Sequence, residues 1–238
     1  MLAGLYGCGG GTAAVPLENT SATSPALVST AASTIEIPTP SSATAPKTTP
    51  TAPGATPDNA LAGWTLVWSD EFSTDGLPDA TKWDYDTDRN QTGWFNGELQ
   101  YYARDRLENA KVEGRSLVIT ARRENLTSAS DYRGQNYTSA RLVTRGKAGW
   151  KYGFFEVRAK LTCGGGTWPA IWTLGTSGNW PEDGEIDSME QAGANKIQVL
   201  GTIHTRAYNY YNGSLGLGQG GSTTVDTFCT AFHKYQLT

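Results

Sequence analysis

The residues of this 238-residue chain best suited to chemistry are three carboxylates in one short segment, "EIDSME". Successive side chains of a β-strand point to opposite faces, so Glu185 and Asp187 would share one face. Glu190 lies an odd number of residues further on and would point to the other face. A regular strand therefore separates the third carboxylate from the first two.

The apolar residues of the same segment indicate an irregular strand instead. In a regular strand Met189 would share a face with Glu185 and Asp187, so each face would mix apolar and charged residues. One extra residue near Ser188, a β-bulge, turns Ile186 and Met189 to the same face and gathers the carboxylates on the other. Bulges are frequent beside active sites, where they re-aim a side chain. We therefore expect a bulge near Ser188.

Three neighbouring carboxylates indicate acid–base chemistry. Like charges raise the pKa of at least one member, and hydrolysis of a glycosidic bond uses such a pair. With carboxyls about 5–5.5 Å apart, one attacks the sugar and the other protonates the leaving oxygen, with retention of configuration. Glu185 and Glu190 fit these roles, and Asp187 would orient Glu185. The alternatives are a solvated acidic strand and a calcium site built from oxygen ligands.

Composition favours a neutral partner. The formal net charge is −4 and the pI is near 5.2, whereas a nucleic-acid-binding chain needs a basic face. The chain has 8 Trp and 11 Tyr against 6 Phe, and rings with a polar edge suit a surface that binds a hydrated ligand. No apolar run is long enough to cross a membrane.

The first 60 residues differ in composition from the rest. Eight of the 11 prolines lie between Pro16 and Pro57, and residues 7–63 contain no aromatic residue. Such a segment cannot bury enough apolar surface to fold, so we expect a disordered, extended linker over residues 1–60. Its start, "LYGC", resembles the end of a bacterial lipoprotein signal, which would lipidate Cys8 and attach the chain to a membrane. We therefore expect an extracellular, cell-surface or periplasmic protein.

Beyond residue 63 the hydrophobic pattern has a period of two. Residues 155–161 place Phe155, Val157, Ala159 and Leu161 on one face and charged residues on the other. Strands are also expected over residues 64–69, 116–124, 138–146, 167–175 and 197–205, separated by Gly, Asn and Asp clusters. No segment has a helical stripe with caps. The sequence therefore predicts an all-β chain folded as an antiparallel β-sandwich or jelly roll.

Three cysteines are too few for a disulfide scaffold. Cys8 stands apart, and Cys163 and Cys229 could pair with each other in an oxidising compartment. Sequence alone does not show whether their Cα atoms are close enough to be bridged.

The segment "GEIDSME" resembles the signature E-[aliphatic]-D-x-x-E of glycoside hydrolase family 16 in its laminarinase-like, bulged form. Further blocks follow in family order: "LVWSDEF", "NGELQYY", "LVITARRE", "YTSARLVTRGK", "KYGFFEVRAKL", "GTWPAIWTLG" and "GTIHT". The resemblance covers nearly all of the chain from Trp64 onward. It implies a catalytic domain over residues 61–238 with a concanavalin-like jelly roll, a cleft across its concave face, and retaining endo-hydrolysis of β-1,3-linked glucans.

The resemblance also assigns roles to single residues. Glu185 would be the nucleophile, Asp187 the assisting carboxylate and Glu190 the general acid/base. Six further residues would line the substrate cleft: the sugar-stacking Trp168, Trp172 and Trp180, with core packing as the alternative for one of them, and Asn96, Arg141 and His204. His233 is expected to be structural.

Family members continue beyond "FHKYQLT" with further strands of both sheets. The resemblance therefore implies that this chain is truncated at its C-terminus, which would leave unpaired strand edges. No cofactor is expected. Relatives often carry a structural calcium ion, for which the sequence identifies no ligands. We expect a monomer that acts on a neutral β-glucan and binds no nucleic acid.

Other functions fit the same fold. Within the enzymes, the alternatives are a mixed-linkage β-1,3-1,4-glucanase and an agarase-like or carrageenan-cleaving hydrolase, the last of which would favour a basic cleft. In another class, the chain would be a glucan-binding, lectin-like module without activity. The intact Glu185, Asp187 and Glu190 trio argues against the binding module.

Overall fold

The computed structural model describes residues 2–5, 63–195, 197–209 and 219–238. The chain divides into two units, and the second one, residues 11–65, lies almost entirely outside these ranges. Cys8 and most of the expected linker therefore also lie outside the described residues. Leu2–Leu5, at the start of that linker, form strand β1 instead, because their backbone pairs with β10 (Pro169–Leu174) and β8 (Leu142–Val143) of the large sheet. Everything that follows concerns the first unit.

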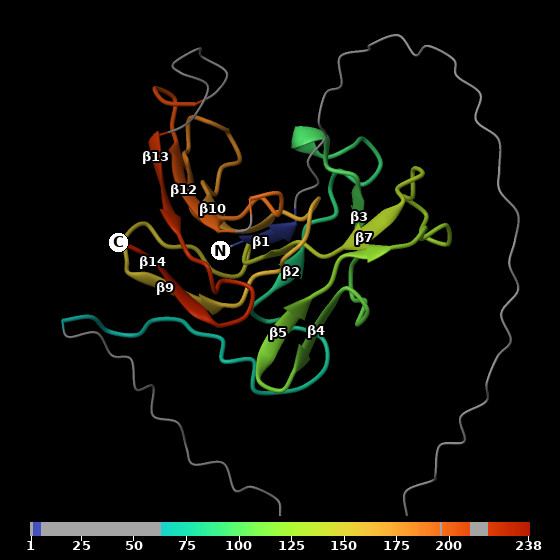
Figure 1. Ribbon diagram of the computed structural model, residues 1–238, viewed down its shortest axis with the longest axis horizontal. Coiled ribbons are helices and arrows are strands. Elements are labelled where there is room, and N and C mark those ends of the chain that lie inside the picture. Colours follow the sequence, from blue (N-terminus) through green and yellow to red (C-terminus); the bar gives the residue numbers. More distant parts are fainter. Residues whose placement is uncertain (1, 6–62, 196, 210–218) are drawn as a thin grey trace, which may run out of the picture. The chain divides into compact units, whose positions relative to one another are not determined.

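The described strands form one large sheet and three small ones, in the arrangement that Figure 1 shows. The large sheet has the order β13 (Gln219–Thr224), β12 (Gln198–His204), β11 (Glu185–Glu190), β10 (Pro169–Leu174), β1 (Leu2–Leu5), β8 (Leu142–Val143) and β2 (Asp84–Tyr85). The small sheets pair β14 (His233–Leu237) with β9 (Phe155–Ala159), β7 (Tyr137–Ser139) with β3 (Gln100–Tyr102) and β6 (Arg122–Arg123), and β4 (Ala110–Glu113) with β5 (Ser116–Ile119).

The architecture confirms the all-β prediction. Every strand pair in the described ranges is antiparallel except β3 with β7, which run parallel. The helical content there is one three-residue 3₁₀ turn, η1 (Phe95–Gly97). No helix in the described part of the chain has the length and apolar character that crossing a membrane would need.

One expected strand is wrong. Residues 64–69 have alternating apolar positions, but the structure forms no strand there. A strand needs a partner whose backbone completes its hydrogen bonds. Among the described residues none pairs with this segment, and Trp64, Leu66 and Val67 are exposed.

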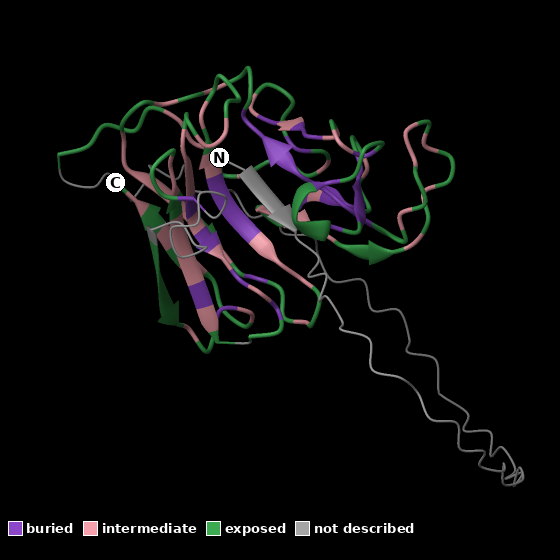
Figure 2. Cartoon of the chain, turned by 90° about the horizontal axis from the view of Figure 1, so that it is seen from above, coloured by how far each residue is buried: buried purple, intermediate pink, exposed green. Residues whose placement is uncertain are grey.

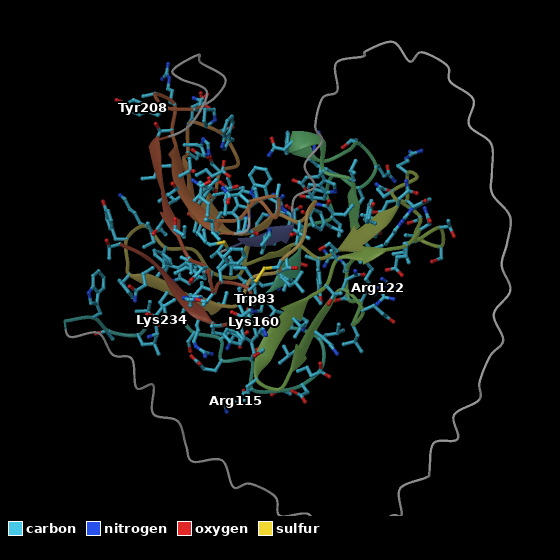
Figure 3. All side chains as sticks on the ribbon, in the orientation of Figure 1. Trp83, Arg115, Arg122, Lys160, Tyr208 and Lys234 are labelled. Carbon is cyan, nitrogen blue, oxygen red and sulfur yellow. A yellow bond between two sulfur atoms is a disulfide. The ribbon has the colours of Figure 1, made fainter. Side chains whose placement is uncertain are left out.

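A buried cluster joins the large sheet to the β9–β14 pair as two layers of a sandwich. Val157 and Ala159 of β9 and Tyr235 of β14 pack against a core from the large sheet that includes Ile171 and Met189. This is the inward face predicted for residues 155–161. The opposite face of the pair carries charged side chains, and Figure 3 shows Lys160 and Lys234 on its outside. In Figure 2 the buried residues are concentrated in the strands, whereas the connecting segments are mostly exposed or intermediate.

The bulge predicted near Ser188 is confirmed by the registers of β11 with both of its neighbours. On the β10 side, Asp187 pairs with Trp172 and Met189 with Ile171, so Ser188 has no counterpart. The ladder with β12 is shifted over the same stretch, between Asp187 and Glu190. Met189 consequently points into the core and is 1% exposed.

The Cys163–Cys229 disulfide, which the sequence left open, is formed (yellow in Figure 3). It ties the segment after β9 to the segment between β13 and β14. Cys229 also packs against the sandwich core. The bridge therefore holds in place the loop that leads into β10.

Met189→Ala tests whether the bulge is anchored by core burial. Deleting a fully buried side chain of this size costs about 2–5 kcal/mol in the free energy of unfolding. Ile203, on the same face of the next strand, is 44% exposed, so Ile203→Ala should cost less than about 1 kcal/mol. Chemical denaturation of both variants measures the difference. Equal losses would contradict the anchoring role of Met189.

Candidate active site

The three carboxylates lie on β11, between β12 and β10 of the large sheet, and share one face. Glu185 lies opposite His204 of β12, and Asp187 lies opposite Trp172 of β10. Glu190 is brought to the same face by the bulge, opposite Ala170. The sequence therefore predicted the arrangement of the trio, since the bulge follows from the alternation of apolar and acidic residues.

Glu185 is held by an indole from the loop between β10 and β11. Trp180 Nε1 donates a hydrogen bond of 2.5 Å to Glu185 Oε2. The loop is closed on itself by Asp183, which accepts hydrogen bonds from Ser177 and from the backbone N–H of Asn179. The carboxylate thus has a donor fixed by its own loop.

Glu190 also accepts a hydrogen bond from an indole, that of a different tryptophan. Trp168 Nε1 donates a hydrogen bond of 3.1 Å to Glu190 Oε1. Trp168 ends the loop that the disulfide anchors, and the backbone N–H of Gly193 donates to the Thr167 carbonyl at 2.8 Å. A side chain at Gly193 would overlap the Gly164 carbonyl, so only glycine fits this approach.

Asp187 lies deepest of the three and contacts a histidine. It is 5% exposed, and its Oδ2 lies 3.2 Å from His204 Nε2. Burial raises the pKa of Asp187 to about 9, and the charges of Glu185 and Glu190 act in the same direction. The hydrogen bond between the Asp187 and Glu185 carboxyls also raises the pKa of Asp187, so the neutral form of Asp187 is favoured.

The pKa of Glu190 is also shifted. Burial raises the pKa of Glu190 above its ordinary value, and the charge of Glu185 adds to the effect, whereas the Trp168 N–H opposes it. The face thus presents two glutamates in different surroundings: Glu185 accepts a hydrogen bond from Trp180, and Glu190 has a raised pKa because it is buried. This is the pairing that general acid and nucleophilic catalysis requires.

The other residues expected along the cleft occupy different positions. Trp172 is 4% exposed and packs with Val143 and Ala170 in the core. Arg141 is 5% exposed and forms an ion pair with Asp86 at 3.0 Å. Contact of Trp172 and Arg141 with a substrate stays a prediction, and the structure shows both as buried supports of the site.

The remaining predicted residues are an asparagine and two histidines. Asn96 is exposed on η1 with a positive φ of 57°. His204 touches Asp187, as described above. His233, expected to be structural, lies in β14 with Nε2 3.1 Å from Thr227 Oγ1.

Sequence reasoning missed a buried acid in the "NGELQ" segment. Glu98 is 9% exposed, and its Oε2 accepts hydrogen bonds of 2.8 Å from both Gln100 Nε2 and Tyr102 Oη. Burial raises the pKa of Glu98 to about 7. The only signal in the sequence was its position one residue before Leu99 and two before a strand, which does not distinguish a buried acid from an exposed one.

No metal ligand set is found in the described residues. None of their His, Cys, Asp and Glu side chains form a group of three or more that could hold a metal ion.

Glu98→Gln tests the buried acid through its effect on stability. Because its pKa is raised in the folded chain, Glu98 contributes stability that is fully present below about pH 4.5 and is lost as the pH rises through about 7. Glutamine keeps both acceptor contacts and needs no proton. Relative to the unchanged chain, the variant should gain roughly 3 kcal/mol in the free energy of unfolding between pH 4.5 and 8.

Denaturation at several pH values measures this gain. Glu182→Gln, at an exposed position of the same chain, is the matched control and should show no such trend. A Glu98→Gln profile parallel to that of the unchanged chain would contradict the raised pKa.

Known proteins similar to this chain include glycosyl hydrolases. The model of glycosyl hydrolases family 16 matches residues 98–238. A β-glucanase of Rhodothermus marinus is 55% identical over 179 residues, which is 73% of this chain and 59% of that protein. The chain therefore spans about three fifths of the length of this relative.

Two solved structures are similar to the fold. The laminarinase from Rhodothermus marinus superposes with a TM-score of 0.66 and 54% identity over 73% of this chain and 66% of that chain. SCLam, a non-specific endo-β-1,3(4)-glucanase, superposes with a TM-score of 0.69 and 53% identity over 72% and 63% of the two chains. With the family model matching more than half of its residues, this chain belongs to glycosyl hydrolases family 16.

Proposed function

We propose that the chain is an endo-glycosidase that hydrolyses β-1,3-glucosidic bonds of laminarin-type β-glucans with retention of configuration. One observation carries the proposal: Glu185 and Glu190 share a face of the sheet, each with an indole N–H donor, and Asp187 lies between them. Two carboxyls on one face are the machinery of glycoside hydrolysis. The similarity to a laminarinase and to an endo-β-1,3(4)-glucanase supports the substrate class.

In the first step Glu190 gives its proton to the glycosidic oxygen while Glu185 attacks the anomeric carbon. The bond from that carbon to the oxygen breaks, the leaving chain departs as an alcohol, and the sugar is bonded to Glu185. In the second step the Glu190 carboxylate takes a proton from water, which attacks the same carbon and releases Glu185. Two inversions restore the original configuration.

The neighbours of Glu185 and Glu190 explain their division of roles. The Trp180 N–H donates to Glu185 and holds its carboxyl in the position from which it attacks. The proton on Asp187 lets Glu185 sit beside a second carboxyl without a second negative charge. Burial of Glu190 keeps its proton available for the leaving oxygen. Trp168 and Trp180 therefore act as positioning residues through these hydrogen bonds.

A second candidate is hydrolysis of mixed-linkage β-1,3-1,4-glucans. The similar structure SCLam is described as non-specific between the two glucans. The same carboxyl pair can hydrolyse both linkages. Which linkage is cleaved depends on how the protein binds the sugars on either side of that bond. The agarase-like and lectin-like alternatives have no such support among the features of the site.

We also propose that the chain works outside the cytosol, as an exported and membrane-attached monomer. The Cys163–Cys229 disulfide supports an oxidising compartment. The lipoprotein-like "LYGC" start supports attachment through Cys8. Palmitate incorporation in a bacterial host would test the attachment, and its absence would remove that support.

Reducing-sugar release from laminarin, lichenan and agarose tests the function. The chain should hydrolyse laminarin, and Glu185→Ala should lower the rate at least about 1,000-fold, because it removes the group that attacks the sugar. Glu182→Ala, which removes an exposed acid three residues earlier, is the matched control and should retain full activity. Tight laminarin binding without hydrolysis would favour the lectin-like alternative. Activity on agarose alone would overturn the substrate assignment.

A further inference from the structure

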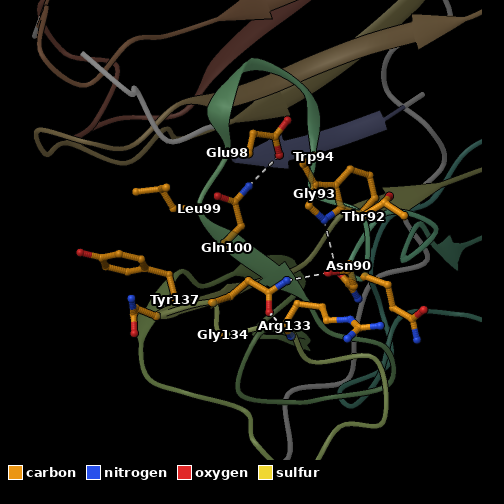
Figure 4. Close-up of a pocket in the computed structure, with 13 residues that line it drawn as sticks. Asn90, Thr92, Gly93, Trp94, Glu98, Leu99, Gln100, Arg133, Gly134 and Tyr137 are labelled. Carbon is orange, nitrogen blue, oxygen red and sulfur yellow. Dashed lines mark hydrogen bonds between the residues drawn. The ribbon is translucent and has the colours of Figure 1, made fainter. Parts of the chain in front are cut away.

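A cavity of about 380 Å³ lies between two segments that the catalytic proposal does not use, residues 90–100 and residues 133–137 (Figure 4). Its size lies within the range of small-molecule binding sites. None of the three carboxylates of the active site lines it. The described residues around it supply five primary amides, two aromatic rings, one guanidinium and one carboxyl.

The walls of the cavity are fixed before any ligand arrives. Asn90 Oδ1 accepts hydrogen bonds from Trp94 Nε1 at 3.1 Å and from the Tyr102 backbone N–H at 3.0 Å. Asn90 Nδ2 donates to the Tyr102 carbonyl at 2.9 Å. Gln135 Nε2, from the other segment, donates to the Asn90 carbonyl at 2.7 Å, so the two walls are bonded together. Little ordering is then needed when a ligand binds.

Several groups at the cavity remain available to a ligand. For Gln91 and Arg133, both exposed, the described part of the chain supplies no side-chain hydrogen bond or ion pair. Tyr137 is 39% exposed and Leu99 is 55% exposed, and Figure 4 shows both on the same side of the cavity. Amides donate and accept hydrogen bonds as sugar hydroxyls do, and an aromatic ring packs against the C–H face of a sugar.

The carboxyl of Glu98 is a buried part of the cavity wall. Glu98 Oε1 is buried and accepts no hydrogen bond from any described residue, although Oε2 of the same carboxyl accepts two. A buried acceptor without a donor costs free energy. Because this oxygen is closed off from solvent, it belongs to the wall of the cavity and is not a contact for a ligand.

The cavity adjoins the active site through a stack of three side chains. The Arg141 guanidinium lies 5.0 Å from the ring of Trp94, a wall of the cavity. The same guanidinium lies 4.6 Å from the ring of Trp172, which is paired with Asp187 in the sheet. One arginine therefore separates the cavity wall from the strand that neighbours the carboxylates.

We propose that this cavity is a second binding site for the same neutral β-glucan, holding glucosyl units at a distance from the bond that is broken. The inference rests on the proposed function for the identity of its ligand. Amide groups outnumber charged groups around the cavity. Its one cation, Arg133, and its one carboxyl, Glu98, have opposite signs. An uncharged polyol therefore fits the cavity better than an anion. Long glucans gain from both sites, whereas short oligosaccharides occupy one.

Binding to a chain that does not hydrolyse its ligand tests the proposal. In the Glu185→Gln background, isothermal titration with laminarin and with laminaritriose compares a long and a short glucan. Adding Tyr137→Ala, or separately Gln91→Ala, should weaken laminarin binding about tenfold for the tyrosine and severalfold for the glutamine. Laminaritriose binding should change much less. Tyr152→Ala, which removes a tyrosine that is 81% exposed elsewhere on the surface, is the matched control.

Three results would overturn the proposal. Laminarin affinity of the Tyr137→Ala and Gln91→Ala chains equal to that of the Tyr152→Ala chain would show that the cavity binds no glucan. Equal weakening for laminarin and laminaritriose would place the effect in the active site. An altered thermal unfolding curve for both cavity variants would assign it to the fold. Because the readout is binding, failure of laminarin hydrolysis in the unchanged chain would refute the proposed function and leave this measurement intact.

Discussion

The candidate active site depends on a β-bulge, that is, on one residue more in β11 than a regular strand would contain. The bulge at Ser188 lets β11 send Met189 into the core and Glu190 to the face that carries Glu185 and Asp187. Without it, side-chain alternation would bury the acid or expose the methionine. Core burial therefore fixes a reactive group, since the same backbone irregularity satisfies both requirements. Bulges are conserved features of this kind because they aim a side chain.

Bringing three carboxylates together costs free energy. Raised pKa values and hydrogen bonds from indole N–H groups reduce that cost. Asp187 and Glu190 both have raised pKa values, mainly because they are buried. The two glutamates each receive an indole N–H from a separate loop. One loop is fixed by the Cys163–Cys229 disulfide and the other by hydrogen bonds to its own aspartate. Rigid supports of this kind keep catalytic groups in reacting positions without reorganisation.

The sequence was informative where a single local rule decided the outcome. Alternation along residues 155–161 predicted the inward face of β9, and the mixture of acids and apolar residues in "EIDSME" predicted the bulge. It failed where a partner far along the chain decides. Residues 64–69 alternate like a strand but form no β-ladder with any described strand. The indole donors to the glutamates, the burial of Trp172 and the raised pKa of Glu98 likewise arise from contacts between distant segments.

The central claim is that Glu185 and Glu190 lie close enough on one face for the charge of one to affect the other. Carbon-13 NMR of the Glu190 carboxyl, assigned by its loss in Glu190→Gln, measures this through a pH titration. The account predicts a pKa of Glu190 above its ordinary value of 4.5, and a lower pKa when Glu185→Gln removes the neighbouring charge. An ordinary Glu190 pKa that does not respond to Glu185→Gln would contradict it.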